Sequence, residues 1–443
     1  MNGCNHRGKQ YEKGLKATDQ VIYGAFVHIL KGELVPAMGC TEPIALAYAA
    51  ALARETLGKM PDSIAIRASG NIVKNVKSVV VPHTGGLRGI AAAVAAGVVA
   101  GKAVDELEVI SNVTPSQVAQ ISSYMAKTPI SISEAADSNC VFFLGVTVRC
   151  ENEEAEVCIA GYHTNVVLVR KDNEILRQLD YSEDGPDPSQ EYSLLSVERI
   201  VEFAHCVNLA DVREPLARQI AYNTAVAQAG LEGNWGARIG KILLCSYGDN
   251  IANRARAWAA AGSDARMNGC ELPVVINSGS GNQGMTASLP VIVYARAMAM
   301  EEDTLYRALV VSNLVTIHLK TGIGRLSAYC GVISAGSGAG AGIAYLHGSG
   351  YSEIASTIIN ALAINSGVIC DGAKASCAAK ISSAVDAGLL GLRMMQHGSE
   401  FKSGDGIVDA CVESTIRNVC LLAREGMRET DKTIIGLMTE PHA

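Results

Sequence analysis

The chain has 443 residues, of which 49% are hydrophobic and only 18% are charged, so it can bury a large core in two domains or in one domain with an insertion. Its formal net charge of −7 and the lack of a basic stripe with interleaved aromatics argue against nucleic acid as a partner. The chain has thirteen cysteines and a polar start without an apolar signal core, which favours a cytoplasmic protein without a disulfide framework.

The N-terminal segment is predicted to be helical, with an amphipathic pattern at 23–30 and an Ala- and Leu-rich stretch at 44–54. Gly39-Cys-Thr-Glu-Pro43 interrupts it. Pro43 suits the first turn of a helix, and Thr41 is expected to be its N-cap. A helix start offers free backbone N–H groups to an anion, so Cys40, Thr41 and Glu42 are candidate site residues. An ordinary capped helix explains the same pattern equally well.

Strand-like segments follow at 63–67, 76–81, 141–149, 156–160 and 165–170, with a predicted helix at 91–104. Long Ala-, Leu- and Ile-rich stretches resume from about residue 194. We therefore expect an α+β fold in which a largely helical domain carries a smaller α/β domain inserted near the N-terminus. The expected limits are 1–58 for the N-terminal helical segment, 59–190 for the α/β domain and 191–443 for the helical domain.

Residues 326–346 form a long stretch without charges. The stretch is rich in glycine and serine rather than in the Leu, Ile and Phe that face lipid. We expect it to be a buried core segment and not a membrane helix, and we expect no membrane partner.

Two polar loops are predicted at strand ends: one holds His83 and Thr84, and the other holds His163 and Asn165. Loops at strand ends often contact ligands, although a lone histidine there is more often a surface residue. All four residues are candidates for substrate binding.

A glycine-rich loop runs from Ser278 to Gly284. It matches a dinucleotide fingerprint only formally, because Pro290 falls where the phosphate-binding helix should continue and the βαβ pattern is missing. The loop could cradle a carboxylate through its N–H groups and polar side chains, or it could be a plain connector between helices. The candidate side chains are Ser278, Ser280, Asn282 and Gln283.

Cys330, Cys370 and Cys377 each stand next to a glycine-bearing break. Zinc sites usually use tight pairs of ligands and a fourth ligand, so this spacing suits zinc poorly. Three separated thiols suit a cubane iron–sulfur cluster with one iron left open to act as a Lewis acid. Spacing alone, however, favours three buried thiols. Lys320 and Arg325 flank Cys330 and could neutralise a substrate carboxylate, with Lys320 also a candidate catalytic residue.

The last pair of cysteines imposes a geometric condition. On one straight helix, seven residues would separate Cys370 and Cys377 by about 10.5 Å along the axis, which is too far to hold one compact cluster. We therefore expect a helix to end near Cys370, the chain to turn at Asp371-Gly372, and a new helix to start near Lys374.

Three motifs together resemble the L-cysteine desulfidase family (UPF0597), whose members are relatives of the iron–sulfur L-serine dehydratase alpha chain. The motifs are Gly39-Cys-Thr-Glu-Pro43, Asn277-Ser-Gly-Ser-Gly-Asn-Gln-Gly284, and Cys330 with Cys370-Asp-Gly and Cys377. The resemblance covers nearly the whole chain. It implies a [4Fe-4S] cluster bound by Cys330, Cys370 and Cys377, in a catalytic domain at 191–443, and places Cys40 near the active site as a base or transient ligand.

The resemblance also implies a lyase that breaks L-cysteine down to pyruvate, ammonia and sulfide without pyridoxal phosphate. On this hypothesis Cys40 removes the Cα proton, with Glu42 or a histidine as the fallback base. The partner is then an amino acid, L-cysteine or possibly L-serine, and we expect a homo-oligomer such as a dimer. The rivals are an L-serine dehydratase, a pyridoxal-phosphate lyase using Lys374 or Lys320, and a non-enzymatic iron–sulfur sensor.

Overall fold

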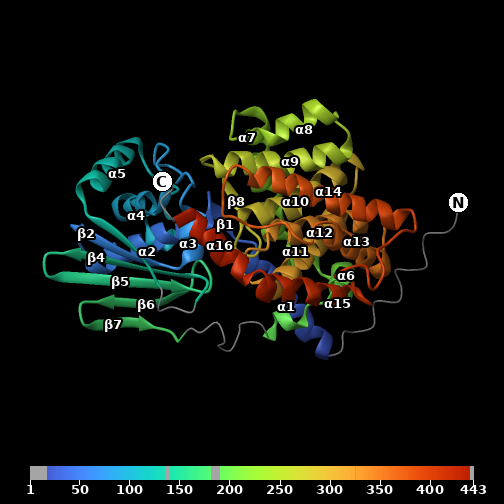
Figure 1. The fold of residues 1–443 in the computed structure, drawn as a ribbon, viewed down its shortest axis with the longest axis horizontal. Helices are drawn as coiled ribbons and strands as arrows, with labels where there is room; N and C mark the ends of the chain where they lie inside the picture. The colour runs from blue at the N-terminus through green and yellow to red at the C-terminus, as the bar shows by residue number, and fades with distance from the viewer. Residues whose placement is uncertain (1–16, 136–139, 181–189, 325, 440–443) are drawn as a thin grey trace.

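The computed structural model describes residues 17–135, 140–180, 190–324 and 326–439. A sheet with covering helices forms one side of the molecule, and a bundle of helices forms the other (Figure 1). The expected α+β fold, mostly helical with a smaller sheet unit near the N-terminus, is confirmed.

The sheet has six strands in the order β3-β2-β4-β5-β6-β7. β2 and β3 run parallel, and the other neighbours run antiparallel. Alternate residues such as Ile64, Ile66, Leu144 and Val146 are buried, which is the period-2 pattern of a sheet with one covered face. The strands are β2 (Ser63–Ala68), β3 (Ile130–Glu134), β4 (Phe143–Cys150), β5 (Glu153–Ala160), β6 (Val166–Lys171) and β7 (Glu174–Gln178).

Helices cover one face of this sheet. α2 packs directly on β4, β5 and β6, and α4 packs on α2. The elements on this side are α2 (Thr41–Leu57), α3 (Gly70–Val76), α4 (Gly89–Ala100), η1 (Ala103–Glu108) and α5 (Pro115–Lys127). A two-stranded antiparallel ribbon of β1 (Pro36–Met38) and β8 (Pro273–Val275) joins this side to the helical side (Figure 1).

The helical side is built around α12 (Gly331–Leu346), which is buried from Val332 to Leu346 and packs on α10, α11, α13 and α14. Residues 326–346 are thus core, as expected, and no helix among the described residues is long and apolar enough to cross a membrane. The other elements are α1 (Ala17–Glu33), η3 (Tyr192–Leu194), α6 (Val197–Cys206), η4 (Leu209–Asp211), α7 (Arg213–Glu232), α8 (Ile239–Tyr247), α9 (Ile251–Met267), α10 (Gly281–Ala297), α11 (Glu302–Ile323), α13 (Tyr351–Ile364), α14 (Cys377–Gln396), α15 (Val412–Leu421), η5 (Leu422–Gly426) and α16 (Arg428–Thr439).

Glycines let α12 and α14 approach each other closely and in parallel. A Cβ on Gly336 would lie 2.3 Å from the Ala384 carbonyl oxygen, and one on Gly340 would lie 2.8 Å from that of Gly388. The contact of Gly336 with Ala384 and that of Gly340 with Gly388 are four residues apart in both helices and follow the same order. The two helices therefore run in the same direction, and their N-termini lie at the same end. Cys330 precedes α12 and Cys377 begins α14, and this packing brings the two cysteines together.

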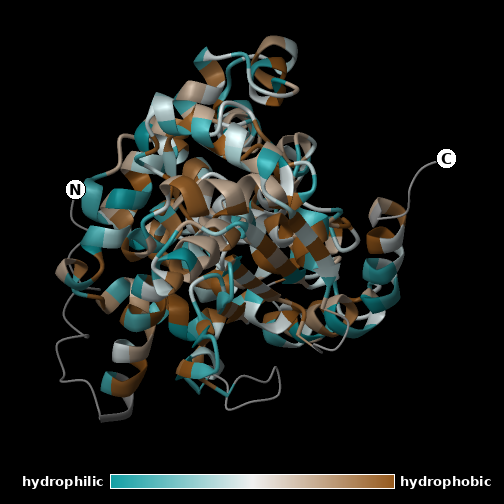
Figure 2. Ribbon diagram, turned by 90° about the vertical axis from the view of Figure 1, so that its left-hand side faces the viewer, coloured by the Kyte–Doolittle hydropathy of each residue, from teal (hydrophilic) through white to brown (hydrophobic). Residues whose placement is uncertain are grey.

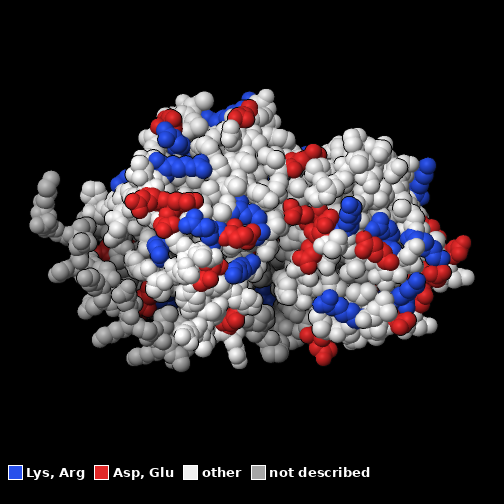
Figure 3. All heavy atoms as spheres, turned by 180° about the vertical axis from the view of Figure 1, so that it is seen from behind, with Lys and Arg blue, Asp and Glu red and all other residues white. Residues whose placement is uncertain are grey.

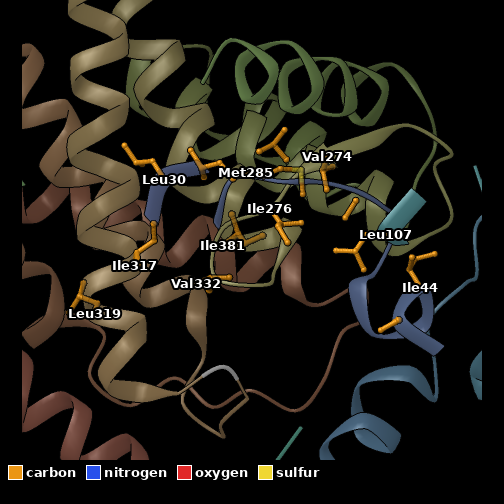
Figure 4. Packing of buried hydrophobic residues seen from close by; sticks show 14 of the residues in the cluster. Leu30, Ile44, Leu107, Val274, Ile276, Met285, Ile317, Leu319, Val332 and Ile381 are labelled. Carbon is orange, nitrogen blue, oxygen red and sulfur yellow. The ribbon is translucent and has the colours of Figure 1, made fainter. Parts of the chain in front are cut away.

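One hydrophobic cluster runs through both sides of the molecule. In Figure 4 it includes Ile44 of α2, Val274 of β8, Ile317 of α11 and Ile381 of α14. Hydrophobic residues gather toward the middle in Figure 2, and many outer segments are hydrophilic. The C-terminal helix α16 returns from the helical side to pack on α3 beside the sheet.

Several local predictions were wrong. Residues 76–81 were expected to be a strand, but Val76 ends α3 and the following segment makes only an isolated bridge at Val80. The helix expected at 91–104 is α4, which ends at Ala100. Pro290 does not interrupt α10, which continues through it to Ala297. The limits 1–58, 59–190 and 191–443 stay a prediction, to which the structure adds that α2 lies on the sheet.

Candidate active site

The Gly39–Pro43 segment leads into α2 and touches the glycine loop of the helical side. Cys40, not Thr41, is the N-cap of α2, and Thr41 is the first helical residue. The Thr41 hydroxyl donates to the carbonyl oxygen of Gly279 at 2.8 Å. This bond joins two segments that are 238 residues apart in the chain.

Cys40 and Glu42 form a buried pair. The Cys40 thiol donates to Glu42 Oε2 at 3.1 Å, and Asn75 Nδ2 donates to Oε1 at 3.0 Å. Burial and the Glu42 charge raise the pKa of Cys40 well above its usual range, and Arg266 offsets part of this. Burial alone raises the pKa of Glu42, but His163, the Cys40 thiol and Arg266 bring it below its ordinary value. The carboxylate is therefore ionised and the thiol protonated.

Cys330 and Cys370 are held together by a short antiparallel backbone pairing. Tyr329 and Ile369 form an isolated bridge, the Cys330 N–H donates to the Val368 carbonyl at 3.0 Å, and the Cys370 N–H donates to the Ala328 carbonyl at 2.6 Å. Their thiols are hydrogen-bonded to each other. The hydrogen bond between the two thiols is the main cause that raises the pKa of Cys330, and burial raises it further. The same hydrogen bond lowers the pKa of Cys370.

The chain break expected between Cys370 and Cys377 is present, at shifted positions. α13 ends at Ile364 and α14 starts at Cys377 itself, so neither helix boundary lies at the expected residue. Gly372 turns the chain with a φ of 92°, and a Cβ there would lie 2.7 Å from the Lys74 carbonyl oxygen. Only glycine suits that combination of left-handed backbone and close contact.

Positive charges surround the Cys370 loop. The Asp371 carboxylate is paired with both Lys374 and Lys380, and the ammonium of Lys380 also donates to the Ile369 carbonyl at 2.9 Å. Lys74 and the buried Lys320 both help to lower the pKa of Cys370. Thiolates are the form of cysteine that binds metal, so these charges favour a metal-binding state of the loop.

The Cys40 pair and the three cysteines lie side by side. Cys40, Val79 and Met267 form a small buried cluster, and Ala373 and Cys377 pack against it. Four helices, α2, α10, α12 and α14, begin around this region. Their N-terminal N–H groups point their partial positive charge at it, which favours thiolates, an anionic cluster or a carboxylate.

The glycine loop closes one side of this region, and its predicted side chains act differently. Ser280 caps α10 through the Gln283 N–H, and Ser278, at a φ of 50°, donates to Asn277 Oδ1 at 2.9 Å. Asn282 accepts from Arg266, and the Gln283 side chain lies against Gly331, directly after Cys330. All four lie in the loop or the first turn of α10.

Of the two histidine loops, the one with His163 comes nearer to the carboxylate. His163 is buried edge-to-face on Phe142 and acts electrostatically on Glu42. Asn165 donates to the Ala160 carbonyl at 2.9 Å and so braces the turn that carries His163.

The other loop rests on the turn before Cys40, because a Cβ on Gly39 would lie 2.4 Å from Pro82. His83 pairs with Glu271 at 3.4 Å. The Thr84 hydroxyl donates to the Val81 carbonyl at 2.7 Å, which is a bond within the loop. Arg325 lies outside the described residues.

Four of the buried polar atoms without a hydrogen-bond partner in the described part of the chain lie around the site. They are Asn75 Oδ1, His83 Nε2, Gln283 Oε1 and Tyr329 OH. Each such group costs free energy unless something else satisfies it. Their residues adjoin Glu42, the Gly39 turn, Gly331 and Cys330, which is the arrangement of a polar ligand site.

Comparison with known proteins identifies the family. The family described as serine dehydratase alpha chain matches residues 104–436. A UPF0597 protein of Desulfitobacterium hafniense (strain Y51) is 56% identical over 416 residues, covering 94% of this chain and 96% of the relative. UPF0597 proteins of Lachnoclostridium phytofermentans and Finegoldia magna are 48% and 45% identical, over 94% of this chain and 100% and 99% of the relatives.

The chain belongs to the UPF0597 family. This family is related to the serine dehydratase alpha chain, which supports a lyase-type function with a small-molecule substrate. Serine dehydratase alpha chains are generally associated with iron–sulfur clusters.

Cys330, Cys370 and Cys377 give this UPF0597 protein a set of three neighbouring thiols. Among the residues that the structure describes, no three or more His, Cys, Asp or Glu side chains are arranged to hold one metal ion. Cys330 and Cys377 lie at helix starts and Cys370 lies in the loop between α13 and α14. Thiols of this kind, with lysines nearby, are the ligands that an iron–sulfur cluster uses.

Sequence reasoning missed three site residues of this UPF0597 protein: Lys74, Asn75 and Arg266. Lys74 and Asn75 are buried on α3, where a strand was expected to begin nearby. Arg266 is only 3% exposed at the end of α9. For Arg266, the sequence offered one signal of a buried functional charge: a charged residue in a helical stretch rich in alanine and glycine. That signal is weak by itself.

Proposed function

We propose that this protein is an L-cysteine desulfidase, which converts L-cysteine to pyruvate, ammonia and hydrogen sulfide by β-elimination. One observation carries the proposal: the thiols of Cys330 and Cys377, at two helix starts, and of Cys370, in the loop before α14, gather beside the buried Cys40–Glu42 pair. Such a site combines three metal-binding thiols with an acid–base pair, and both are needed for this elimination.

Cys330, Cys370 and Cys377 would hold a [4Fe-4S] cluster. When bound, the cluster supplies an iron without a protein ligand, which acts as a Lewis acid on the departing sulfur. Lys74, Lys320, Lys374 and Lys380 offset the negative charge of the thiolates in a buried setting. Lys74 and Lys320 lower the pKa of Cys370, and Lys374 and Lys380 offset part of the rise that burial causes in the pKa of Cys377.

Cys40 and Glu42 would share the proton transfer. The Glu42 carboxylate takes the thiol proton across the 3.1 Å hydrogen bond, and the resulting Cys40 thiolate removes the Cα proton of the substrate. The electron pair of the Cα–H bond forms the Cα–Cβ double bond as the Cβ–S bond breaks. The released aminoacrylate then takes up water and yields pyruvate and ammonia.

The substrate's carboxylate would lie against the starts of α2 and α10. Thr41 and the loop residues Ser278, Ser280, Asn282 and Gln283 line these starts. Free N–H groups at helix starts bind carboxylates readily. His83 or His163 would line the mouth from the sheet side.

A second candidate is L-serine dehydratase on the same site, which the family match favours. The elimination is the same, with hydroxide in place of sulfide as the leaving group. Comparison of kcat/KM for L-cysteine and L-serine under anaerobic conditions separates the two activities. A ratio in favour of L-serine overturns the desulfidase proposal.

The test of the cluster is anaerobic purification, followed by assays of iron, acid-labile sulfide and pyruvate formation from L-cysteine. Cys330→Ala should lose iron and activity together. Cys158→Ala is the matched control, because Cys158 is a buried cysteine on β5 within the sheet. Full activity of protein that contains no iron would contradict the proposal.

A further inference from the structure

Arg266 carries a positive charge into the interior beside the Cys40–Glu42 pair. It is 3% exposed and lies in the last turn of α9. Its Nε donates to the Gly39 carbonyl at 2.8 Å, and its Nη1 donates to Asn282 Oδ1 at 3.2 Å. One guanidinium thus holds both the turn before Cys40 and the first turn of α10.

No carboxylate pairs with this guanidinium among the described residues, and its two hydrogen bonds go to neutral oxygens. Glu42 lies near enough to be affected electrostatically, but it is bonded to Cys40, Thr41 and Asn75 instead. A buried charge is costly unless it is paired. The position therefore favours an anion from outside the chain.

The fold makes room for this charge. A Cβ on Gly281 would lie 2.4 Å from Nε of Arg266, so only glycine at the start of α10 admits the guanidinium there. The starts of α2 and α10 add their own positive partial charge at the same place. Beside them, Gln283 Oε1 has no partner in the described chain and could accept from an ammonium group.

We propose that Arg266 is the residue against which the α-carboxylate of the amino acid substrate binds, while its Nε keeps the Cys40 turn in position. This inference rests on the proposed function, because it names the group that recognises the substrate of that site. A guanidinium binds a carboxylate through two parallel hydrogen bonds, which a lysine cannot reproduce.

The test compares L-cysteine with L-cysteine methyl ester, whose carboxyl carries no charge. Arg266→Gln should lower kcat/KM for L-cysteine by roughly 10- to 100-fold, mainly through KM, and should change the ester far less. Arg266→Lys should recover part of the loss. Arg254→Gln is the matched control, because Arg254 lies on the same helix and pairs with Asp249 at the surface.

Binding of L-alanine gives a readout without catalysis, since L-alanine has the carboxylate and the ammonium group but nothing to eliminate. It should raise the unfolding temperature of the wild-type protein and of Arg254→Gln, but not that of Arg266→Gln. An unchanged KM and an unchanged L-alanine effect in Arg266→Gln overturn the inference, as does a wild-type protein that L-alanine fails to stabilise. A wild-type protein that binds L-alanine but forms no pyruvate contradicts the proposed function alone.

Discussion

The Sγ atom of Cys40 lies 3.1 Å from Oε2 of Glu42 and donates its proton to that carboxylate. Two effects keep the proton on the thiol. Burial and Glu42 raise the pKa of Cys40, and the neighbours of Glu42 lower the pKa of its carboxyl despite burial. A lone Cys40 thiolate is therefore not the resting state. In the proposed reaction, the base is therefore the pair, with the Glu42 carboxylate accepting the proton of Cys40.

Glu42→Gln should lower kcat by roughly 10²- to 10⁴-fold, because an amide cannot take the Cys40 proton. Cys40→Ala should lose activity similarly and keep most of its iron, since the proposed cluster ligands are Cys330, Cys370 and Cys377. Pyruvate formation and iron content, measured on the same anaerobic samples, check both variants. Wild-type turnover in Glu42→Gln would refute the paired base.

Gly336→Ala should weaken the contact that brings the cluster cysteines together. Its Cβ would lie 2.3 Å from the Ala384 carbonyl oxygen, and overpacking of this kind costs roughly 1 to 3 kcal/mol. Since α12 and α14 must separate at this point, iron content should fall as well. Urea unfolding and iron assays measure the two effects.

Gly24→Ala is the control for this substitution. Gly24 lies in α1 with nothing within 4 Å of its Cβ position, so the change should be neutral or stabilise the protein by up to about 1 kcal/mol. Equal stability and iron content of Gly336→Ala and Gly24→Ala would show that the close approach of α12 and α14 is not required.

Asp431→Ala should release α16 from α3. Lys74 Nζ lies 2.6 Å from Asp431 Oδ1, and the Lys74 side chain is only 1% exposed. Removing one partner of a buried ion pair costs roughly 3 to 5 kcal/mol, because the remaining charge is left unpaired. Urea unfolding and hydrogen exchange of residues 428–439 measure the loss.

Glu429→Ala serves as the comparison on the same helix. Glu429 pairs with Lys432 at the surface, where water screens the attraction and such pairs contribute little to stability. If the two variants were equally stable, the Lys74–Asp431 pair would not anchor the C-terminal helix.

Asp264 should make stability depend on pH. Burial raises its pKa from 3.8 to about 6, although hydrogen bonds from the backbone N–H groups of Gly240 and Ile239 lower it in part. The folded state therefore binds more protons than the unfolded state between these values, and the free energy of unfolding falls as pH rises from about 4 to about 6, then levels off. Subtracting the unfolding free energy of Asp264→Asn at each pH isolates this dependence. A difference that rises with pH would contradict it.

The sequence by itself determined much of the local structure and proposed the chemistry of the site. β-branched residues between polar bounds predicted β2 and β4 to β6, and the expectation that Cys370 and Cys377 hold one cluster predicted the turn that Gly372 makes. These features depend on residues close together in the chain, where side-chain period and backbone preference act directly. The family motifs named the three thiols and Cys40, whose roles remain proposals.

Only the tertiary structure decided which helix starts meet. Parallel packing of α12 on α14 and the bond from Thr41 to Gly279 join distant segments, and neither leaves a local pattern. The same holds for α3: its β-branched end looked like a strand, but it is helical and its Lys74 and Asn75 bond Asp431 and Glu42. Arg266 became recognisable only when its neighbours were known, because a buried charge has meaning through the groups that surround it.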